Sequence, residues 1–302
     1  MQPPEAELHR VGRSDLISEV VSRPLTANPE PPVKINLQRA KAQFQKYQTL
    51  YANPAPGGGM HPVCAAVCSL LLEWQETRGV KGDLLEIGVW FGNGAGLLNQ
   101  HRRDDEKLIL VDLNKSQERF QANVAKGKPL PPEALVFYPG DSLAMRRRDA
   151  LARHRDSARF LHIDGEHSFE AVVSDLDLCA ELINERGIVA VDDVFTAASA
   201  CVTEALYYWL AHNREKLVMF LVGYQKAYLC SARLLPELMD LIYELPIIIG
   251  SWGPQVTLCA SGWVNDRPSY GLVPFVGGTH QRINRVLPKP SFHEMMFGPP
   301  VG

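Results

Sequence analysis

Apolar runs of strand length alternate with segments of helical periodicity through the middle of the chain. Each apolar run could form a buried strand, and the segment after it repeats its apolar residues at the spacing of one helix face. The expected strands are residues 84–87, 107–112, 134–138, 158–163 and 187–191. The expected helices are residues 95–100, 116–126, 142–152, 168–185 and 197–212. These repeated units predict a doubly wound, mostly parallel α/β sheet with right-handed crossovers and helices on both faces.

A hairpin pattern ends this alternation. Residues 217–222 and 226–230 are apolar runs separated by three residues, so they are predicted to pair as antiparallel strands. Residues 234–245 have the periodicity of a further helix. Residues 246–302 are rich in Pro, Gly and aromatic residues without a stable period, which predicts an irregular extension packed on the domain or on a second subunit.

The N-terminal part divides at a proline- and glycine-rich break. Residues 1–33 have many prolines and charges and little periodicity, which predicts a loose arm. Residues 34–51 fit a helix with one apolar stripe, residues 53–59 interrupt it as a linker or a closing segment, and Pro62 begins the next helix. The predicted organisation is an arm or lid with a helix (1–60), a main domain (61–231), and a C-terminal helix with an irregular extension (232–302).

Composition narrows the class of protein. With 302 residues, 46% of them hydrophobic, the chain is long enough for one large α/β domain with additions. A net charge of -3 provides no basic field for nucleic acid, which leaves a small molecule as the expected partner. No segment resembles a signal peptide or a membrane span, and the six cysteines form no Cys-x-x-Cys pair. A cytoplasmic protein is predicted, with a homo-oligomer left open.

A glycine-rich turn follows the first expected strand and organises the chain. Glu86, Gly88, Gly92 and Gly94 stand in the pattern Glu-x-Gly-x-x-x-Gly-x-Gly. Glycines at this spacing let the backbone pass close to a ligand where a Cβ would collide. The pattern differs from the Gly-x-Gly-x-x-Gly of dinucleotide sites, which makes a nicotinamide oxidoreductase a weak alternative. Trp90, inside the turn, is expected to pack over a cofactor or in the core.

Carboxylates follow the expected strand ends, where ligands bind in open α/β sheets. They are Glu86, Asp112, Asp141, Asp164, Asp192 and Asp193. A carboxylate such as Asp112 matches the two hydroxyls of a ribose. Glu86 is expected either to bind a ligand or to accept backbone N–H groups, and Asp141, followed by Ser142, either to contact a ligand or to cap a helix.

Three of these acids predict a metal site. Asp164, Asp192 and Asp193 come from two adjacent strand ends and could converge on Mg²⁺, leaving room for water and two substrate oxygens. One of the consecutive acids, Asp193 more readily than Asp192, could instead cap the following helix. His167, three residues after Asp164, is expected to be a general base, a helix cap or a partner of a carboxylate.

The pattern over residues 82–231 resembles the class I S-adenosylmethionine (SAM) methyltransferases. The turn is similar to their motif I, and the acids after the fourth and fifth strands are similar to those of catechol O-methyltransferase and of sugar O-methyltransferases of the macrocin type. The resemblance implies a Rossmann-like sheet with an antiparallel last strand. It also implies Mg²⁺ on Asp164, Asp192 and Asp193, with His167 where catechol O-methyltransferase has a lysine base. The implied cofactor-binding residues are Glu86, Gly88, Trp90, Gly92, Gly94, Asp112, Asp141, Ser142 and Asp164.

The expected function is therefore methyl transfer from SAM to a hydroxyl of a small molecule. A sugar, a glycosylated natural product or a vicinal diol is the expected acceptor, with Mg²⁺ assisting. Two alternatives stay open: metal-free N- or O-methyl transfer with His167 or Asp164 as the base, and a SAM-binding module without turnover.

Overall fold

The computed structural model describes residues 35–51, 59–114, 117–264 and 267–275, and the expected arm and linker lie largely outside them. The strands are β1 (Asp83–Ile87), β2 (Leu108–Asp112), β3 (Leu135–Pro139), β4 (Ala158–Ile163), β5 (Ile183–Val191), β6 (Val218–Gly223), β7 (Lys226–Cys230), β8 (Val256–Val264) and β9 (Arg267–Pro274). The helices are α2 (Leu37–Tyr51), α3 (Pro62–Thr77), α4 (Asn93–His101), α5 (Glu118–Val124), α6 (Ser142–Arg147), α7 (Phe169–Leu182), α8 (Ala200–His212) and α9 (Leu235–Gly250), with 3₁₀ turns at Pro132–Ala134 and Ala152–His154.

The described strands form one sheet in the order β3-β2-β1-β4-β5-β7-β6-β9-β8. Strands β1 to β5 are parallel, and β7 pairs antiparallel with both β5 and β6. From β5 the chain passes through α8 to β6. It then returns as β7, which lies between β5 and β6 in the sheet. A parallel sheet followed by this hairpin is the arrangement of the class I methyltransferase fold, so the predicted fold class is confirmed.

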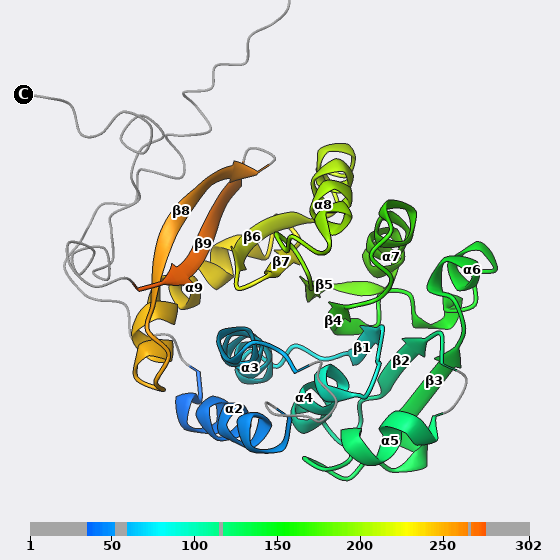
Figure 1. The fold of residues 1–302 in the computed structure, drawn as a ribbon. Helices are drawn as coiled ribbons and strands as arrows, with labels where there is room; N and C mark the ends of the chain where they lie inside the picture. Colours follow the sequence, from blue (N-terminus) through cyan, green and yellow to red (C-terminus); the bar gives the residue numbers. More distant parts are fainter. Residues whose placement is uncertain (1–34, 52–58, 115–116, 265–266, 276–302) are drawn as a thin grey trace, which may run out of the picture. The chain divides into compact units, whose positions relative to one another are not determined.

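Helices cover both faces of the sheet (Figure 1). Helices α7 and α8 pack on one face, where Leu85, Ile163 and Trp209 belong to a continuous buried apolar cluster. Helices α3 and α4 lie on the other face, with α2 packed against both. Side chains alternate between the faces along each strand. Glu86, between buried Leu85 and Ile87, therefore points to the α3 and α4 side.

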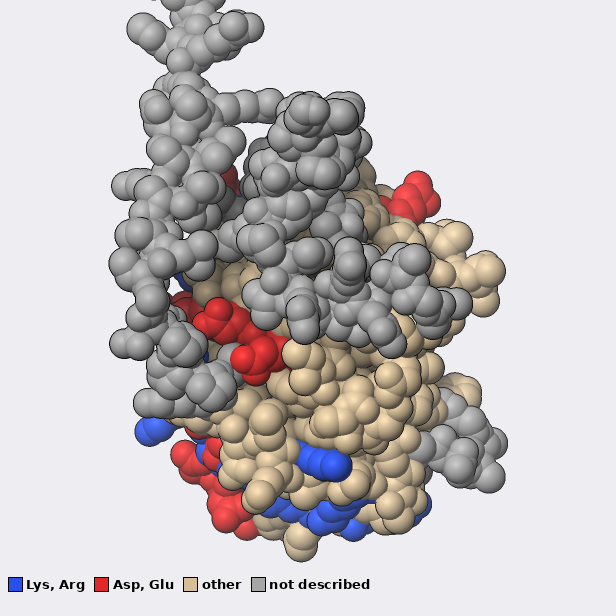
Figure 2. Space-filling model, turned by 90° about the vertical axis from the view of Figure 1, so that its left-hand side faces the viewer, with Lys and Arg blue, Asp and Glu red and all other residues tan. Residues whose placement is uncertain are grey.

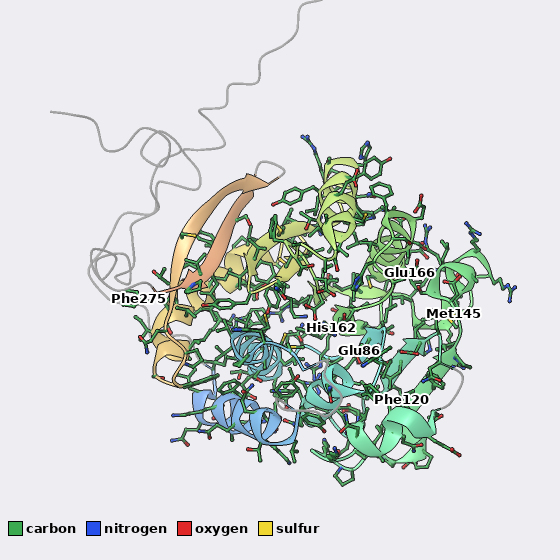
Figure 3. The ribbon with its side chains drawn as sticks, in the orientation of Figure 1. Glu86, Phe120, Met145, His162, Glu166 and Phe275 are labelled. Atoms are coloured by element: carbon green, nitrogen blue, oxygen red, sulfur yellow. The ribbon has the colours of Figure 1, made fainter. Side chains whose placement is uncertain are left out.

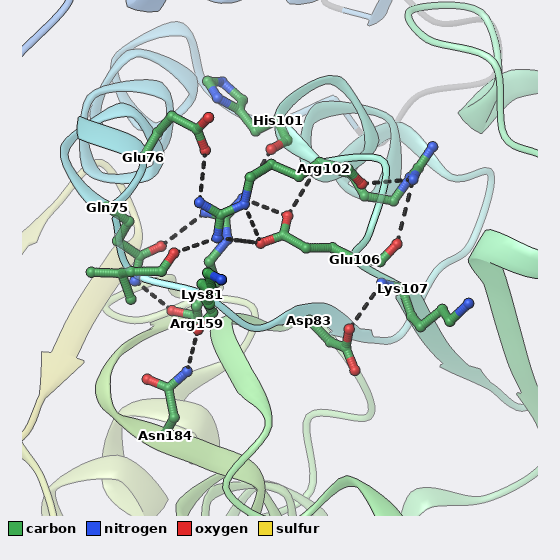
Figure 4. Close-up of polar contacts among 12 residues, drawn as sticks. Gln75, Glu76, Lys81, Asp83, His101, Arg102, Glu106, Lys107, Arg159 and Asn184 are labelled. Atoms are coloured by element: carbon green, nitrogen blue, oxygen red, sulfur yellow. Dashed lines mark hydrogen bonds and ion pairs between the residues drawn. The ribbon is translucent and has the colours of Figure 1, made fainter. Parts of the chain in front are cut away.

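A buried polar network fixes the strand ends opposite the predicted site (Figure 4). Arg159, near the start of β4, is fully buried, and its Nε and Nη2 donate to the two carboxylate oxygens of Glu106 at 2.7 and 2.9 Å. Nη2 also donates to the carbonyl of His101, and Nη1 donates to Gln75 Oε1. Because the guanidinium and the carboxylate satisfy each other, this network joins β4 to α3 and α4 without leaving a buried charge unpaired.

Several predicted boundaries differ from the structure, and three helix ends show why. Helix α7 ends at Leu182, and Ile183 already pairs with Ala158, so the polar residues read as the helix end belong to β5. Helix α6 ends at Arg147, five residues before the expected end. Helix α9 instead continues through Pro246 to Gly250, because Ile248 and Ile249 remain buried.

The C-terminal extension is more regular than its composition predicts. Strands β8 and β9 form an antiparallel hairpin, and β9 pairs parallel with β6. The hairpin therefore extends the main sheet, and the prediction of an irregular segment is wrong for residues 256–264 and 267–274. Tertiary pairing supplies the order here, since the local sequence shows no alternating period.

The described surface carries charged side chains of both signs. On the face in Figure 2, Lys and Arg side chains gather mainly along one edge, and acidic and uncharged side chains occupy the rest of the described surface. Among the described residues, no helix combines the length and apolar character that a membrane span requires.

Candidate active site

Glu86 and His162 form a buried pair in the centre of the sheet. The two residues are direct neighbours in the parallel register of β1 and β4, and both are almost fully buried (Figure 3). Nδ1 of His162 lies 2.7 Å from Oε1 of Glu86. Burial raises the pKa of Glu86, although the hydrogen bond from His162 opposes that rise. Glu86 is thus held by a side chain rather than only by backbone amides.

The glycine turn is as tight as its sequence predicts. Gly88 has φ +83°, and a Cβ there would overlap the backbone carbonyl of Asp164. Gly92, also at φ +83°, precedes α4 in the left-handed conformation, where a Cβ would press on Val124. Gly94 packs directly on the Glu86 carboxylate. The glycines therefore permit close backbone contacts with the strand ends, one of them with the loop after β4.

Asp112 holds this turn from the end of β2. Its Oδ2 accepts hydrogen bonds from the backbone N–H groups of Val89 at 2.6 Å and Trp90 at 2.9 Å, and its Oδ1 accepts from the N–H of Asn114 at 2.6 Å. Trp90 has φ +52°, and its side chain is 59% exposed and packs edge-on against Phe91. It is not a core residue, so the turn presents an aromatic ring at the surface.

Asp141 and Ser142 begin helix α6. Asp141 caps the helix by accepting a hydrogen bond from the N–H of Leu143 at 2.9 Å, which is the structural role left open in the sequence. Ser142 is near Asp175 of α7, a carboxylate that is 1% exposed. Burial raises the pKa of Asp175 to about 7, while the Ser142 hydroxyl lowers it and the charges of Asp141 and Glu166 add to the rise.

A buried lysine that sequence reasoning missed occupies the centre of the acid cluster. Val191 pairs with Ala227 in the antiparallel register of β5 and β7, so Lys226 comes beside Asp192. Its Nζ lies 2.6 Å from Oδ2 of Asp192 and 2.7 Å from Nε2 of His162. The lysine is 0% exposed. Burial opposes the charge of Lys226, but the Asp192 carboxylate outweighs it and raises the pKa of the lysine.

The contacts of His162 determine its tautomer. Burial and the Lys226 ammonium lower the pKa of His162, whereas the nearby carboxylates of Asp192 and Glu86 raise it. The 2.7 Å contact between Nζ and Nε2 nevertheless needs a lone pair, because two facing N–H groups repel each other. We therefore assign the neutral ring, with Nδ1–H donating to Glu86 and Nε2 accepting from Lys226.

The predicted metal ligands fall into two overlapping groups. Among the described residues, the potential ligand atoms of His162, Asp164 and Asp192 lie within 4.8 Å of one another, as do those of Asp164, His167 and Asp193. Asp164 is common to both, so the three predicted carboxylates meet at one edge but divide between two arrangements. A small hollow adjoins them, lined by Ile163, Asp164, Gly165, Glu166, His167, Val172, Val191, Asp192 and Val202.

The pKa values of Asp164 and Asp192 are shifted in opposite directions. Partial removal from water and the charge of Asp192 raise the pKa of Asp164 to about 7. Because the Asp164 side chain is exposed, repulsion by Asp192 is the cause that we weight more heavily. Burial would also raise the pKa of Asp192, but the Lys226 ammonium holds it well below its usual range. Asp192 is thus an ionised carboxylate.

His167 is engaged at both ring nitrogens. Its Nε2 lies 2.9 Å from Oδ2 of Asp193, and its Nδ1 lies 2.9 Å from the hydroxyl of Ser199, which precedes α8. Since Asp193 only accepts, Nε2 carries the proton in the neutral ring, and Nδ1 has the basic lone pair. Asp193 and Phe195 both have positive φ, at 59° and 64°, so this loop is strained next to the predicted site. The histidine is oriented by a carboxylate, as predicted for one of its alternatives.

Only weak sequence signals mark the two missed residues. His162 lies inside an apolar strand, where a lone histidine is usually a core residue, and Lys226 begins an apolar strand where a surface lysine is expected. A histidine near the carboxyl end of β4 and a lysine at the start of β7 are the signal that could have been used. Pairing them with Glu86 and Asp192 required the strand register.

Comparison with known proteins identifies the class of this domain. The family model described as a methyltransferase domain matches residues 85–194, from β1 to just after β5. The match covers 110 of the 302 residues, so over residues 85–194 the chain is similar to a methyltransferase domain, in agreement with the predicted enzyme class. No curated protein matches the chain.

Several solved structures are similar in fold. The chain is similar to the O-methyltransferase NovP, with 19% identity, 56% of this chain and 80% of that chain covered, and a TM-score of 0.47. It is similar to the O-methyltransferase TomG from Streptomyces achromogenes in complex with SAM, with 13% identity, 65% and 90% covered, and a TM-score of 0.45. A third is the MycE methyltransferase in complex with Mg, SAH and mycinamycin VI, with 14% identity, 64% and 54% covered, and a TM-score of 0.44. No residue of this chain is assigned from these likenesses.

Proposed function

We propose that this protein is a SAM-dependent O-methyltransferase that methylates a hydroxyl of a small molecule with the assistance of Mg²⁺. The methyltransferase domain over residues 85–194 supports the reaction class. The observation that carries the proposal is the contact of Gly88 with the backbone carbonyl of Asp164. This contact brings the glycine turn against the loop of the acid cluster, so a cofactor on the turn and an acceptor at the acids would be neighbours.

The cofactor is proposed to bind along the ends of β1, β2 and β3. Asp112 would accept from one ribose hydroxyl through the remaining lone pair of Oδ1 while its other lone pairs keep the turn in place, and Glu86 would support the turn from inside the sheet. Trp90 would cover the methionine part of SAM, and the start of α6 would contact the adenine. The proposed set is Glu86, Gly88, Trp90, Gly92, Gly94, Asp112, Asp141, Ser142 and Asp164.

The donor set fits a hard divalent cation. Asp164, Asp192 and Asp193 offer carboxylate oxygens, the ligands that Mg²⁺ prefers, and the imidazoles of His162 and His167 lie beside them. When bound, the cation would lower the pKa of an acceptor hydroxyl and orient it. Two vicinal oxygens would suit such a site, so we propose a sugar, a glycosylated natural product or another vicinal diol as the acceptor.

The chain's own residues would orient the reactants and move one proton. The acceptor oxygen attacks the methyl carbon in line with the departing sulfur, the carbon–sulfur bond breaks, and the products are the methyl ether, S-adenosylhomocysteine and a proton. Nδ1 of His167 is the proposed proton acceptor, with Asp193 holding the ring through Nε2. Ser199 would have to turn its hydroxyl away or pass the proton on.

A metal-free reaction is the second candidate, and the Lys226–Asp192 pair favours it. The ammonium already supplies a positive charge next to the carboxylate that a cation would contact. Under this alternative the acceptor is deprotonated by His167 or Asp164 alone. Activity that persists in EDTA would support it, and activity that requires added Mg²⁺ would exclude it.

Ligand-induced thermal shifts test the proposal. A ligand that binds only the folded chain raises its Tm, so SAM and S-adenosylhomocysteine should raise it and NAD should not. Asp193→Asn, at a proposed metal ligand outside the cofactor set, should keep the SAM shift and lose the Mg²⁺ response. Asp104→Asn, at a side chain that is 96% exposed, is the matched control and should keep both. A Tm insensitive to SAM would overturn the cofactor assignment.

A further inference from the structure

Lys226 has contacts that the proposed reaction does not use. It is the first residue of β7, it is fully buried, and its Nζ touches Asp192 and His162 but no solvent. The other ring nitrogen of His162, Nδ1, lies 2.7 Å from Oε1 of Glu86. A fully buried lysine is rare and costs solvation free energy, so its position between a proposed metal ligand and a proposed cofactor residue calls for a reason.

We infer that Lys226 is a permanent counter-ion of Asp192, whose ammonium keeps the acid cluster assembled without metal. Because this charge already neutralises Asp192, it weakens the binding of a divalent cation there. The inference rests on the proposed function, because it concerns the cation of that same site. Lys226 acts through Asp192 and is a positioning residue; it touches neither substrate nor cofactor in this scheme.

The charges of the cluster support this role. Glu86, Asp164 and Asp192 would repel one another as three nearby carboxylates, and the Lys226 ammonium lies 2.6 Å from one of them. An ammonium is a fixed cation that cannot leave the site. A divalent ion at Asp192 would then face a positive charge within a few ångströms, and this repulsion falls slowly with distance in a partly buried site.

A purely structural lysine would predict something else. If Lys226 only stabilised the fold, its replacement would lower the Tm without changing affinity for a cation. A counter-ion predicts a compensation, because a cation at Asp192 should replace the lost charge. A measurement of cation affinity therefore distinguishes the structural role from the counter-ion role, whereas a measurement of stability alone does not.

The test measures Mn²⁺ binding to the full chain by electron paramagnetic resonance, with Mn²⁺ as the probe for the Mg²⁺ site. Lys226→Met keeps most of the side-chain volume and removes the charge, and it should bind Mn²⁺ at least about tenfold more tightly than the wild type. Lys226→Arg keeps the charge and should stay near the wild type. Lys216→Met, at an exposed lysine, is the matched control and should change nothing.

Thermal unfolding provides a second readout. Lys226→Met should unfold at lower temperature than the wild type without metal, and Mn²⁺ should raise its Tm more than that of the wild type. If Lys226→Met does not fold, Lys226→Gln, which is uncharged and keeps an amide donor, is measured in its place with the same expectations.

Failure of the inference is distinguishable from failure of the proposed function. If the wild type binds Mn²⁺ and Lys226→Met binds it equally or more weakly, the counter-ion role is overturned and the metal site stands. If neither the wild type nor the variant binds Mn²⁺, the proposed metal site and the counter-ion role both fall. The SAM-induced shift, measured on the same samples, reports separately on the cofactor.

Discussion

Gly94 lies so close to Glu86 that a Cβ on the glycine would overlap Oε1 of the carboxylate. This contact connects the first turn of α4 to the buried pair of Glu86 and His162. Gly94→Ala gains helix propensity of up to about 1 kcal/mol, but the displaced carboxylate should cost about 1–3 kcal/mol. We expect a lower unfolding free energy and a reduced SAM-induced shift, measured by chemical denaturation and thermal unfolding.

Gly250→Ala is the matched control for this prediction. Gly250 is also helical, at the end of α9, and a Cβ there meets nothing within 4 Å. Its replacement should gain up to about 1 kcal/mol of helix propensity and lose nothing to packing, so stability should not fall. Equal effects at the two glycines would contradict the assigned packing of the turn on Glu86.

Asp112 should matter for both the turn and the cofactor. Asp112→Ala removes the acceptor of the Val89 and Trp90 N–H groups, so we expect a loss of about 1–3 kcal/mol in stability and no SAM-induced shift. Asp104→Ala, an exposed acid, should leave both unchanged. A stability loss with an intact SAM shift would mean that Asp112 only shapes the turn.

The Arg159–Glu106 pair should be structural. Arg159→Met removes one of the two guanidinium partners of the buried Glu106 carboxylate and leaves Arg103 at 2.6 Å, so it should cost about 1–3 kcal/mol. Arg155→Ala removes an exposed pair with Asp149 and should cost no more than about 1 kcal/mol. Because Arg159 is at the end of the sheet away from the site, SAM should still raise the Tm of any folded Arg159→Met protein. Loss of that shift would contradict this placement.

Asp175 should make stability depend on pH. Its folded-state pKa of about 7 is above the ordinary value of an aspartate, so the folded state binds the proton that the unfolded state has released. The contribution of Asp175 to stability is therefore complete below about pH 4 and is lost as the pH rises through about 4 to 7, by a few kcal/mol at most.

Asp175→Asn removes this titration while keeping the shape of the side chain. The variant should equal the wild type near pH 4 and exceed it near pH 8, as measured by urea unfolding at both pH values. A variant that is less stable than the wild type at pH 8 would show that the ionised carboxylate is stabilised in the fold by contacts stronger than its burial cost.

Sequence reasoning located the fold through residues whose periodicity is local. The alternation of apolar runs and helical segments predicted five parallel strands, and the three-residue turn before Lys226 predicted the antiparallel pair. The hairpin of β8 and β9 was missed because its order comes from pairing with β6. Pairing between distant segments leaves no period in either segment.

The candidate site divides in the same way. Glycine spacing and carboxylates at strand ends are properties of the sequence, since buried parallel strands end where their apolar runs end, and they were enough to locate Glu86, Asp112, Asp164 and Asp192 at one edge. Only the tertiary structure decided that His162 lies beside Glu86 and Lys226 beside Asp192, because a strand's register is set by the packing of the whole sheet. The sequence thus determined which groups reach the edge of the sheet, and the register of the strands determined which charges neutralise one another there.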